Sequence, residues 1–179
     1  MRFSELPIIG AWSIEPEPRV DNRGEFARTF CAEEFAQHGL AATMCQTSIS
    51  TNLRRGTLRG MHFRPESDNE AKLVRCTQGK VCDVIVDVRP GSKSFKKWVA
   101  VELSAHSRNA LYIPPGCAHG FITLMDNTEL FYMMSAPYKD GSERGVRWND
   151  PAFAIAWPLP PIVISDRDAQ YPDYQPHLP

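Results

Sequence analysis

The stretch KLVRCTQGKVCDVIVDVRP, residues 72–90, decides the fold class of this chain. It contains two runs of β-branched residues, one around Val74 and one from Val81 to Val88. The segment TQGK between them, with Gly79, is a turn signal. The stretch therefore predicts two β-strands joined by a tight turn.

Further short strands are predicted at close spacing after this pair. Their sequences are KKWVAVELS (96–104), NALYIPPG (109–116), GFITLM (120–125) and ELFYMMS (129–135), each bounded by Pro, Gly, Asn or Asp. Short strands at this spacing are typical of an antiparallel sandwich or barrel. The one good helix candidate is CAEEFAQHG (31–39), with Phe35 on its apolar side and Gly39 at its end.

The C-terminal stretch 157–179 is crowded with proline and predicts an extended arm over the body, without regular helix. The sequence has no internal repeat, low-complexity segment or linker. We therefore expect a single all-β domain over residues 1–179, with a few short helices and extended N- and C-terminal arms.

Composition limits the class of protein. The 179 residues are 42% hydrophobic and 23% charged, as in a globular protein, and the net charge of -1 argues against a nucleic-acid partner. No apolar run approaches the roughly 20 residues of a membrane helix, so no membrane partner is expected. Five cysteines without a C-x-x-C pair predict buried free thiols in a reducing cytoplasm: Cys31, Cys45, Cys76, Cys82 and Cys117.

Histidines in a β-barrel raise the question of a metal. The segment PPGCAH ends in His119 and matches one of the two motifs of cupin-type metalloenzymes. The H-x-H of the other motif is absent, because Phe63 and Arg64 follow His62. A site short of one ligand, with cationic side chains nearby, is a poor metal site. We expect no metal and no cofactor, and we keep a metal cupin as an alternative class.

Five residues suit proton transfer beside a carbonyl group. His62 titrates near neutrality and can act as a base, and Tyr132 can donate a proton. Lys72 and Arg59 can stabilise an oxyanion, and Asp168 can orient the imidazole. An acid and a base on opposite sides of one carbon would invert its configuration through an enolate. Each residue also has a structural interpretation: a hydrogen-bonded strand histidine, a core tyrosine, or a lysine on the solvent face.

The run GTLRGMHF, residues 56–63, raises the question of whether Arg59 and His62 can face the same cavity. Arg59 and His62 are three positions apart, so on a regular strand they would point to opposite faces. If both face one cavity, Gly60 should mark a bulge or twist that redirects one of them.

The chain resembles the dTDP-4-dehydrorhamnose 3,5-epimerase family nearly end to end. The matching stretches are DNRGEFART (21–29), GTLRGMHF (56–63), EAKLVRCTQGKVCDVIVDVRPGS (70–92), IPPGCAHGF (113–121), NTELFYMMSAPY (127–138), ERGVRWNDPAFAIAWP (143–158) and ISDRD (164–168). The resemblance implies a cupin-like jelly-roll barrel without metal. It also implies a homodimer with exchanged N-terminal strands and a dTDP-linked 4-keto-6-deoxy sugar as substrate.

The resemblance also implies roles for particular residues. His62 corresponds to the base, Tyr132 to the opposing acid and Asp168 to the partner of the histidine, while Lys72 corresponds to a ligand of the sugar and its enolate. Arg23 and Arg59 are similar to residues that grip the diphosphate. The full set implied for substrate binding is Arg23, Phe26, Gln46, Ser48, Arg59, His119, Tyr138, Glu143 and Arg167.

Four positions depart from the family pattern. The chain has Arg28 where the family often has an acidic residue, and Met133 where it often has a basic one. It has Ser48 where the family usually has asparagine, and Arg64 where it usually has glutamine. Because three of them fall on strands expected to contact the substrate, the sequence specifies the reaction class better than the substrate. Two enzymatic alternatives stay open, a C3-only epimerase and an enzyme for another nucleotide-linked 4-keto sugar. The alternative of another class is a non-catalytic cupin that binds a sugar nucleotide.

Overall fold

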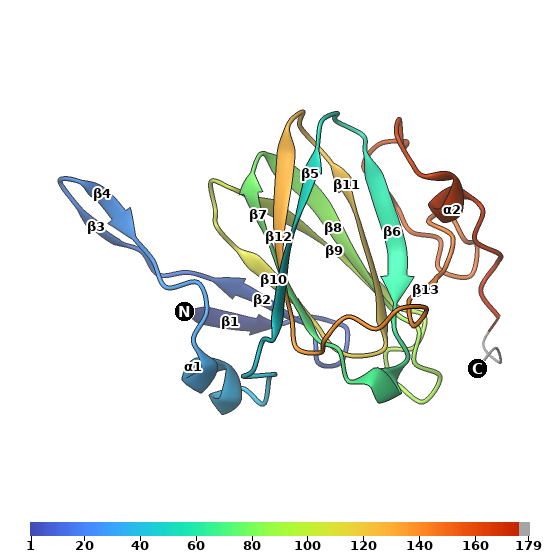
Figure 1. Ribbon diagram of the computed structural model, residues 1–179, viewed down its shortest axis with the longest axis horizontal. Helices are drawn as coiled ribbons and strands as arrows, with labels where there is room; N and C mark the ends of the chain where they lie inside the picture. Colours follow the sequence, from blue (N-terminus) through green and yellow to red (C-terminus); the bar gives the residue numbers. More distant parts are fainter. Residues whose placement is uncertain (176–179) are drawn as a thin grey trace.

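The computed structural model describes residues 1–175, and most of the regular structure in this part of the chain is β-strand. Two antiparallel sheets face each other (Figure 1). The strands are β1 (Arg2–Glu5), β2 (Trp12–Glu15), β3 (Arg19–Asp21), β4 (Gly24–Phe26), β5 (Gln46–Asn52), β6 (Leu58–Phe63), β7 (Lys72–Gln78), β8 (Lys80–Asp87), β9 (Trp98–Ser104), β10 (Ala110–Ile113), β11 (Cys117–Thr123), β12 (Thr128–Met134) and β13 (Arg144–Gly145). The helices are α1 (Ala32–Gln37), α2 (Asp166–Ala169) and the 3-10 turn η1 (Glu66–Asp68). The predicted all-β, cupin-like antiparallel fold is confirmed.

The two predicted strands of residues 72–90 form β7 and β8, but they belong to different sheets. The larger sheet has the order β1-β2-β10-β7-β12-β5, and the smaller one the order β13-β6-β11-β8-β9. Gly79, with a φ of +77°, turns the chain from one sheet into the other, and a Cβ there would overlap Thr128. The turn is therefore a corner between sheets and not a β-hairpin, because each strand buries one face in the space between the sheets.

The apolar core fills one part of this space. Along β8, Val81 and Ile85 point inward, while Val84 and Val86 point to the outer face, as strand alternation requires. The facing residues of the larger sheet are Val74, Cys76, Leu111, Ile113 and Leu130. Toward β5 and β6 polar side chains replace this apolar filling, and a cavity opens between the sheets.

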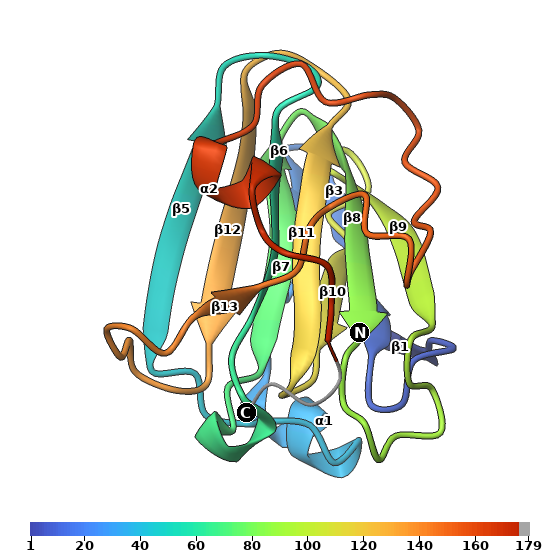
Figure 2. The same cartoon turned by 90° about the vertical axis from the view of Figure 1, so that its right-hand side faces the viewer.

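Both sheets are also covered on their outer faces. The predicted helix at 31–39 is confirmed as α1; Phe35 is fully buried against the larger sheet, and Gly39, at φ +70°, follows the helix. The smaller sheet is covered by the C-terminal segment, which crosses it in Figure 2. There Met61 of β6 packs in one cluster with Phe153 and Trp157.

The C-terminal arm differs from the expectation in one respect. The proline-rich stretch contains the short helix α2, although no regular helix was predicted there. The reason is local, because the segment between Pro161 and Pro172 contains no proline and the Ser165 hydroxyl accepts a hydrogen bond from the Asp168 N–H at the helix start. The part of the predicted arm beyond residue 175 lies outside the described residues.

Two further sequence expectations concern membrane helices and the cysteines. Within residues 1–175 no helix has both the length and the hydropathy needed to cross a lipid bilayer. The five cysteines are free thiols, and Cys76 and Cys117 are buried as expected. Cys45, however, is exposed, because it precedes β5 at the open edge of the larger sheet.

Candidate active site

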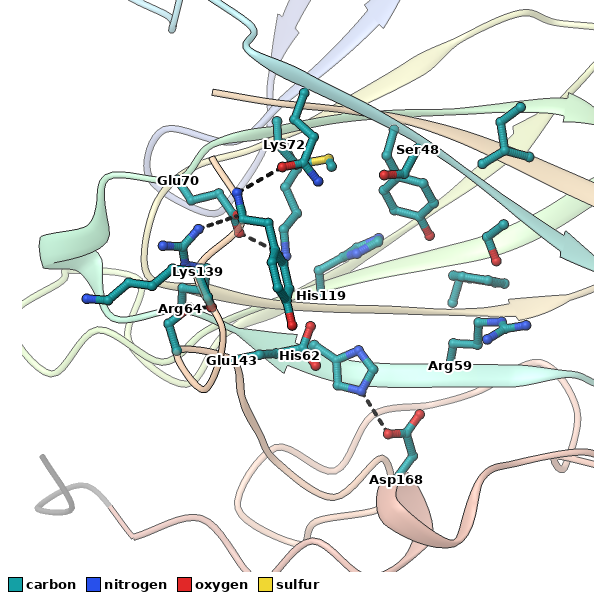
Figure 3. A pocket seen from close by; sticks show the side chains of 18 of the residues that line it. Ser48, Arg59, His62, Arg64, Glu70, Lys72, His119, Lys139, Glu143 and Asp168 are labelled. Carbon is teal, nitrogen blue, oxygen red and sulfur yellow. Dashed lines mark hydrogen bonds and ion pairs between the residues drawn. The ribbon is translucent and has the colours of Figure 1, made fainter. Parts of the chain in front are cut away.

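The cavity between the sheets has a volume of about 520 Å³ and gathers most of the predicted site residues (Figure 3). His62 reaches it from β6 of the smaller sheet, whereas Tyr132 reaches it from β12 of the larger sheet. The other predicted residues on its wall are Gln46, Ser48, Arg59, Lys72, His119, Tyr138, Glu143, Arg167 and Asp168. Residues from five strands, one loop and the helix α2 are thus brought to one space.

Gly60 explains how Arg59 and His62 share this cavity. On β11, His119 pairs with His62 and Phe121 pairs with Arg59, so between these pairs one residue of β11, Gly120, opposes two residues of β6, Gly60 and Met61. The extra residue on β6 is a bulge that returns both side chains to the inner face. Gly60 has a φ of +118°, and a Cβ there would lie 2.6 Å from the Gly120 Cα. The predicted bulge is confirmed.

His62 is held by Asp168 of α2, from 106 positions along the chain. The His62 Nε2 lies 2.8 Å from Asp168 Oδ1, while Oδ2 accepts the Gly60 N–H at 3.0 Å. Burial alone would raise the pKa of Asp168, but these two donors lower it below its usual value. The carboxylate is therefore ionised at neutral pH and accepts the Nε2 proton, which leaves Nδ1 as the basic nitrogen.

Tyr132 faces His62 from the opposite sheet, next to a second histidine–aspartate pair. Burial is the main cause that raises the pKa of Tyr132 well above its usual value, and the Asp83 charge adds to it, so the phenol stays protonated. The His119 ring lies edge-on to Tyr132, with 6.1 Å between ring centroids. His119 is in turn 2.7 Å from Asp83, which is fully buried. The tyrosine hydroxyl is thus a proton donor in a fixed place.

The two expected cations of the cavity are held by different partners. Arg59 donates from Nε to the Asn52 side chain at 2.8 Å, and Asn52 is itself buried in β5. The Lys72 ammonium lies 3.3 Å from the Glu70 carboxylate. In Figure 3 Lys72 and Glu70 lie toward one end of the cavity and Arg59 toward the other, with His62 between them.

The mouth of the cavity is formed by the segment between β12 and β13. The Tyr138 N–H donates to the Gln46 side chain at 2.8 Å, which ties this segment to β5. The Tyr138 side chain is exposed, while Glu143 pairs with Arg167 across the opening. The exposed Tyr138 ring is therefore open to stacking by a nucleobase from the solvent side.

A family model described as dTDP-4-dehydrorhamnose 3,5-epimerase matches residues 5–175 of this chain. The chain belongs to this family. It is 43% identical over 176 residues to the dTDP-4-dehydrorhamnose 3,5-epimerase of Mycolicibacterium smegmatis, covering 96% of this chain and 85% of that protein. It is 38% identical over 169 residues to the dTDP-4-dehydrorhamnose 3-epimerase of Streptomyces niveus, covering 94% and 81%.

The fold is also that of solved epimerases of the family. The structure superposes with a TM-score of 0.87 on the dTDP-6-deoxy-D-glucose-3,5-epimerase of Legionella pneumophila in complex with dTDP-4-keto-L-rhamnose, at 33% identity and with 97% of this chain and 98% of that chain covered. The family, the isomerase class and the epimerase function predicted from the sequence are therefore confirmed.

Two residues that the family resemblance assigned to the substrate lie outside this cavity. Arg23 and Phe26 are on the β3–β4 hairpin, which projects from the barrel in Figure 1. The Arg23 side chain is 85% exposed and pairs only with Asp21, and Phe26 is 77% exposed. The hairpin follows β2, at the opposite side of the larger sheet from β5, and its Glu25 pairs with Arg108 of the same chain.

The expectation that three of the four departures from the family pattern lie on substrate-contacting strands is corrected, because only two of them line the cavity. Ser48 and Arg64 are on its wall. Met133 points to the outer face of β12 and packs with the α1 cluster, because it alternates with Tyr132. Arg28 is outside the cavity and pairs with Glu34 at 3.1 Å.

Sequence reasoning missed several residues of the site. Asp83 could have been found, since it lies two positions from both Val81 and Ile85 in an apolar run and therefore points into the barrel with them. Tyr171 carried no such signal: its ring lies edge-on to His62 with 6.2 Å between centroids, where a Cβ at Gly145 would overlap it. Glu70 was also overlooked, although it lies two residues before Lys72.

The predicted absence of a metal stays a prediction. Within residues 1–175 no group of three or more His, Cys, Asp or Glu side chains is arranged to hold a metal ion. His62 and His119 each already have a carboxylate partner on Nε2. This donor set suits proton transfer, since each imidazole is oriented by a carboxylate.

Proposed function

We propose that this member of the family inverts both C3 and C5 of dTDP-4-dehydro-6-deoxy-D-glucose to form dTDP-4-dehydro-L-rhamnose, without metal or cofactor. The observation that carries the proposal is the placement of His62 and Tyr132 on opposite sheets, lining one cavity. A base on one face of the sugar and an acid on the other can invert a carbon between them.

The reaction begins when His62 Nδ1 removes the proton on the carbon next to the C4 ketone. The electron pair of the broken C–H bond moves into the ring and onto the C4 oxygen, giving an enolate. Tyr132 then donates its proton to the same carbon from the other face, so the configuration inverts. Both C3 and C5 adjoin C4, so one acid–base pair serves both carbons when the ring shifts between the two steps.

The enolate oxygen needs a fixed cation beside it. Lys72 meets this need because its ammonium lies on the wall of the cavity and is only 17% exposed. Arg59 fits the diphosphate, since a guanidinium fork matches phosphate oxygens. The Tyr138 ring fits the nucleobase, since an aromatic ring stacks on it. The relative from Legionella pneumophila, solved with dTDP-4-keto-L-rhamnose, supports this class of substrate.

Deuterium wash-in tests the reaction directly. The protein is incubated with the dTDP-linked 4-keto sugar in deuterated water, and NMR locates the label. We expect label at both C3 and C5, because both carbons lose and regain a proton. Label at C3 alone would refute the double epimerisation and assign the activity named for the Streptomyces niveus relative. A parallel panel of dTDP, CDP, UDP and GDP 4-keto sugars identifies the preferred nucleotide.

We also infer a homodimer with exchanged N-terminal strands. The β3–β4 hairpin exposes Val20 (75%), Phe26 (77%) and Arg23, yet it stands away from the barrel of its own chain. Such an apolar and cationic projection fits a surface on a second copy. The proposed surface is the edge strand β5 of the partner, where Ile49 is 62% exposed beside the cavity.

Co-expression of two inactive chains tests the exchange. One chain carries His62→Asn and the other Arg23→Ala, so in a mixed dimer one barrel is intact and receives an intact hairpin. With random pairing we expect about a quarter of the wild-type epimerisation rate. The control pair His62→Asn and Tyr132→Phe has a defect in each barrel and should stay inactive. If the first pair is as inactive as the control, the hairpin does not serve a partner.

We further infer that residues 1–179 act as one domain in the cytoplasm. The free state of all five thiols supports a reducing compartment, since exposed Cys45 would be open to oxidation elsewhere. The proposed substrate also fits this compartment, because nucleotide-linked sugars are made in the cytoplasm.

A further inference from the structure

A network of charged side chains at one end of the cavity surrounds Glu70, and the proposed mechanism does not yet use it. One Glu70 oxygen accepts the Arg64 Nη1–H at 3.0 Å, and the other lies 3.3 Å from the Lys72 ammonium. Both Arg64 and Glu70 are 10% exposed, so water screens their charges little. Figure 3 shows the three side chains together, beside the loop that leads to Glu143. One carboxylate is thus shared between a proposed catalytic cation and a second cation.

Arg64 is anchored at three points. Besides Glu70, its Nε donates to Asp68 at 3.0 Å and its Nη1 to the carbonyl oxygen of Pro137 at 3.1 Å. Burial would lower the pKa of Arg64, but the Glu70 and Asp68 carboxylates outweigh it and raise the pKa above its usual value. The guanidinium is therefore a permanent charge in a fixed place, whereas the Lys72 ammonium is carried by a flexible four-carbon stem.

The charges of this network balance only because Arg64 is present. Arg64 and Lys72 supply two positive charges, and Asp68 and Glu70 supply two negative ones. Without Arg64 the network would carry one net negative charge directly beside Lys72. A mostly buried carboxylate without its partner attracts the nearest cation strongly, and it also repels an enolate.

We propose that Arg64 is a positioning residue for Lys72 and acts through Glu70. By holding the Glu70 carboxylate, Arg64 leaves the Lys72 ammonium only a long contact with Glu70 and keeps it available for the enolate oxygen. This inference rests on the proposed function, since it presupposes that Lys72 stabilises the enolate. It assigns a purpose to an arginine at a position where the family usually has glutamine.

A double-mutant cycle tests the proposal by deuterium wash-in. Arg64→Gln should lower kcat about tenfold, because Glu70 then captures Lys72. Glu70→Gln should stay within about threefold of the wild type, since it removes the competing carboxylate. The double variant Arg64→Gln/Glu70→Gln should recover to within about threefold of Glu70→Gln alone. Recovery on removing a second side chain is a result that a purely structural role of Arg64 would not give.

The outcomes separate this inference from the proposed function. If the double variant is as slow as Arg64→Gln or slower, or if Arg64→Gln keeps the wild-type kcat, the coupling through Glu70 is refuted. Lys72→Ala tests the premise that Lys72 stabilises the enolate. If this variant loses exchange but the effects of Arg64→Gln and Glu70→Gln are simply additive, only the inference about Arg64 is refuted. If Lys72→Ala exchanges at the full rate, the proposed role of Lys72 itself is refuted. Arg147→Gln is the matched control, because Arg147 pairs with Asp173 outside the cavity and should leave kcat unchanged.

Discussion

Replacement of His62 by asparagine is expected to abolish deuterium wash-in at both C3 and C5 of the sugar. His62 Nδ1 is the basic nitrogen in the cavity, because Nε2 is 2.8 Å from the ionised Asp168. General-base catalysis contributes about 10²–10⁴-fold to such a step, so we expect a loss of that order in the exchange rate. The measurement is the initial rate of label uptake by NMR in deuterated water.

A matched control distinguishes this loss from damage to the fold. His106→Asn changes an exposed histidine outside the cavity and should exchange at the wild-type rate. The thermal unfolding midpoint of His62→Asn, measured beside the wild type, shows whether the barrel stays folded without the His62–Asp168 hydrogen bond. Exchange within about tenfold of the wild type in His62→Asn would assign the base to another group, with His119 the next to test.

Replacement of Tyr132 by phenylalanine is expected to separate proton exchange from inversion. His62 remains and can remove a proton and return deuterium from the same face, so label should still enter the sugar. Inversion requires a donor on the other face, where Tyr132 supplies the phenol of raised pKa. We therefore expect epimerised product to form about 10²-fold or more slowly, while wash-in changes much less.

The readout for Tyr132→Phe is the ratio of labelled substrate to inverted product, measured by NMR in one sample. Tyr112→Phe is the control, because Tyr112 is also buried in the larger sheet and its hydroxyl accepts the Ala41 N–H at 3.0 Å, but it packs on the outer face. Inversion at the wild-type rate in Tyr132→Phe would show that another acid, or water, protonates the enolate.

The regular elements with strong local patterns were predictable from the sequence. The β-branched runs at residues 72–78 and 81–88, the later strands and the helix ended by Gly39 all appear close to their expected bounds. Each is specified by residues within one strand or one helical turn of each other. The residue pattern alone did not predict the short strands β1, β2, β3, β4 and β13, and N-terminal strands were expected only from the family resemblance.

The site was predictable only in part. The bulge at Gly60 follows from a local conflict, since Arg59 and His62 can share a face only if the strand is irregular between them. The position of Met133 on the outer face also follows from alternation, because it is next to the inward-facing Tyr132. The family resemblance supplied the other site residues, and physical reasoning on the sequence alone left each with a structural alternative.

The sequence by itself determined which segments form strands and which side chains each strand can direct inward, because both depend on a two-residue period. Only the tertiary structure decided which inward groups meet. It joined His62 to Asp168 across 106 positions, placed Asp83 behind His119 and shared Glu70 between Arg64 and Lys72. The physical reason is range: alternation acts between neighbours along the chain. Sharing of a proton or a carboxylate depends on distances of about 3 Å between side chains of different strands, loops and helices.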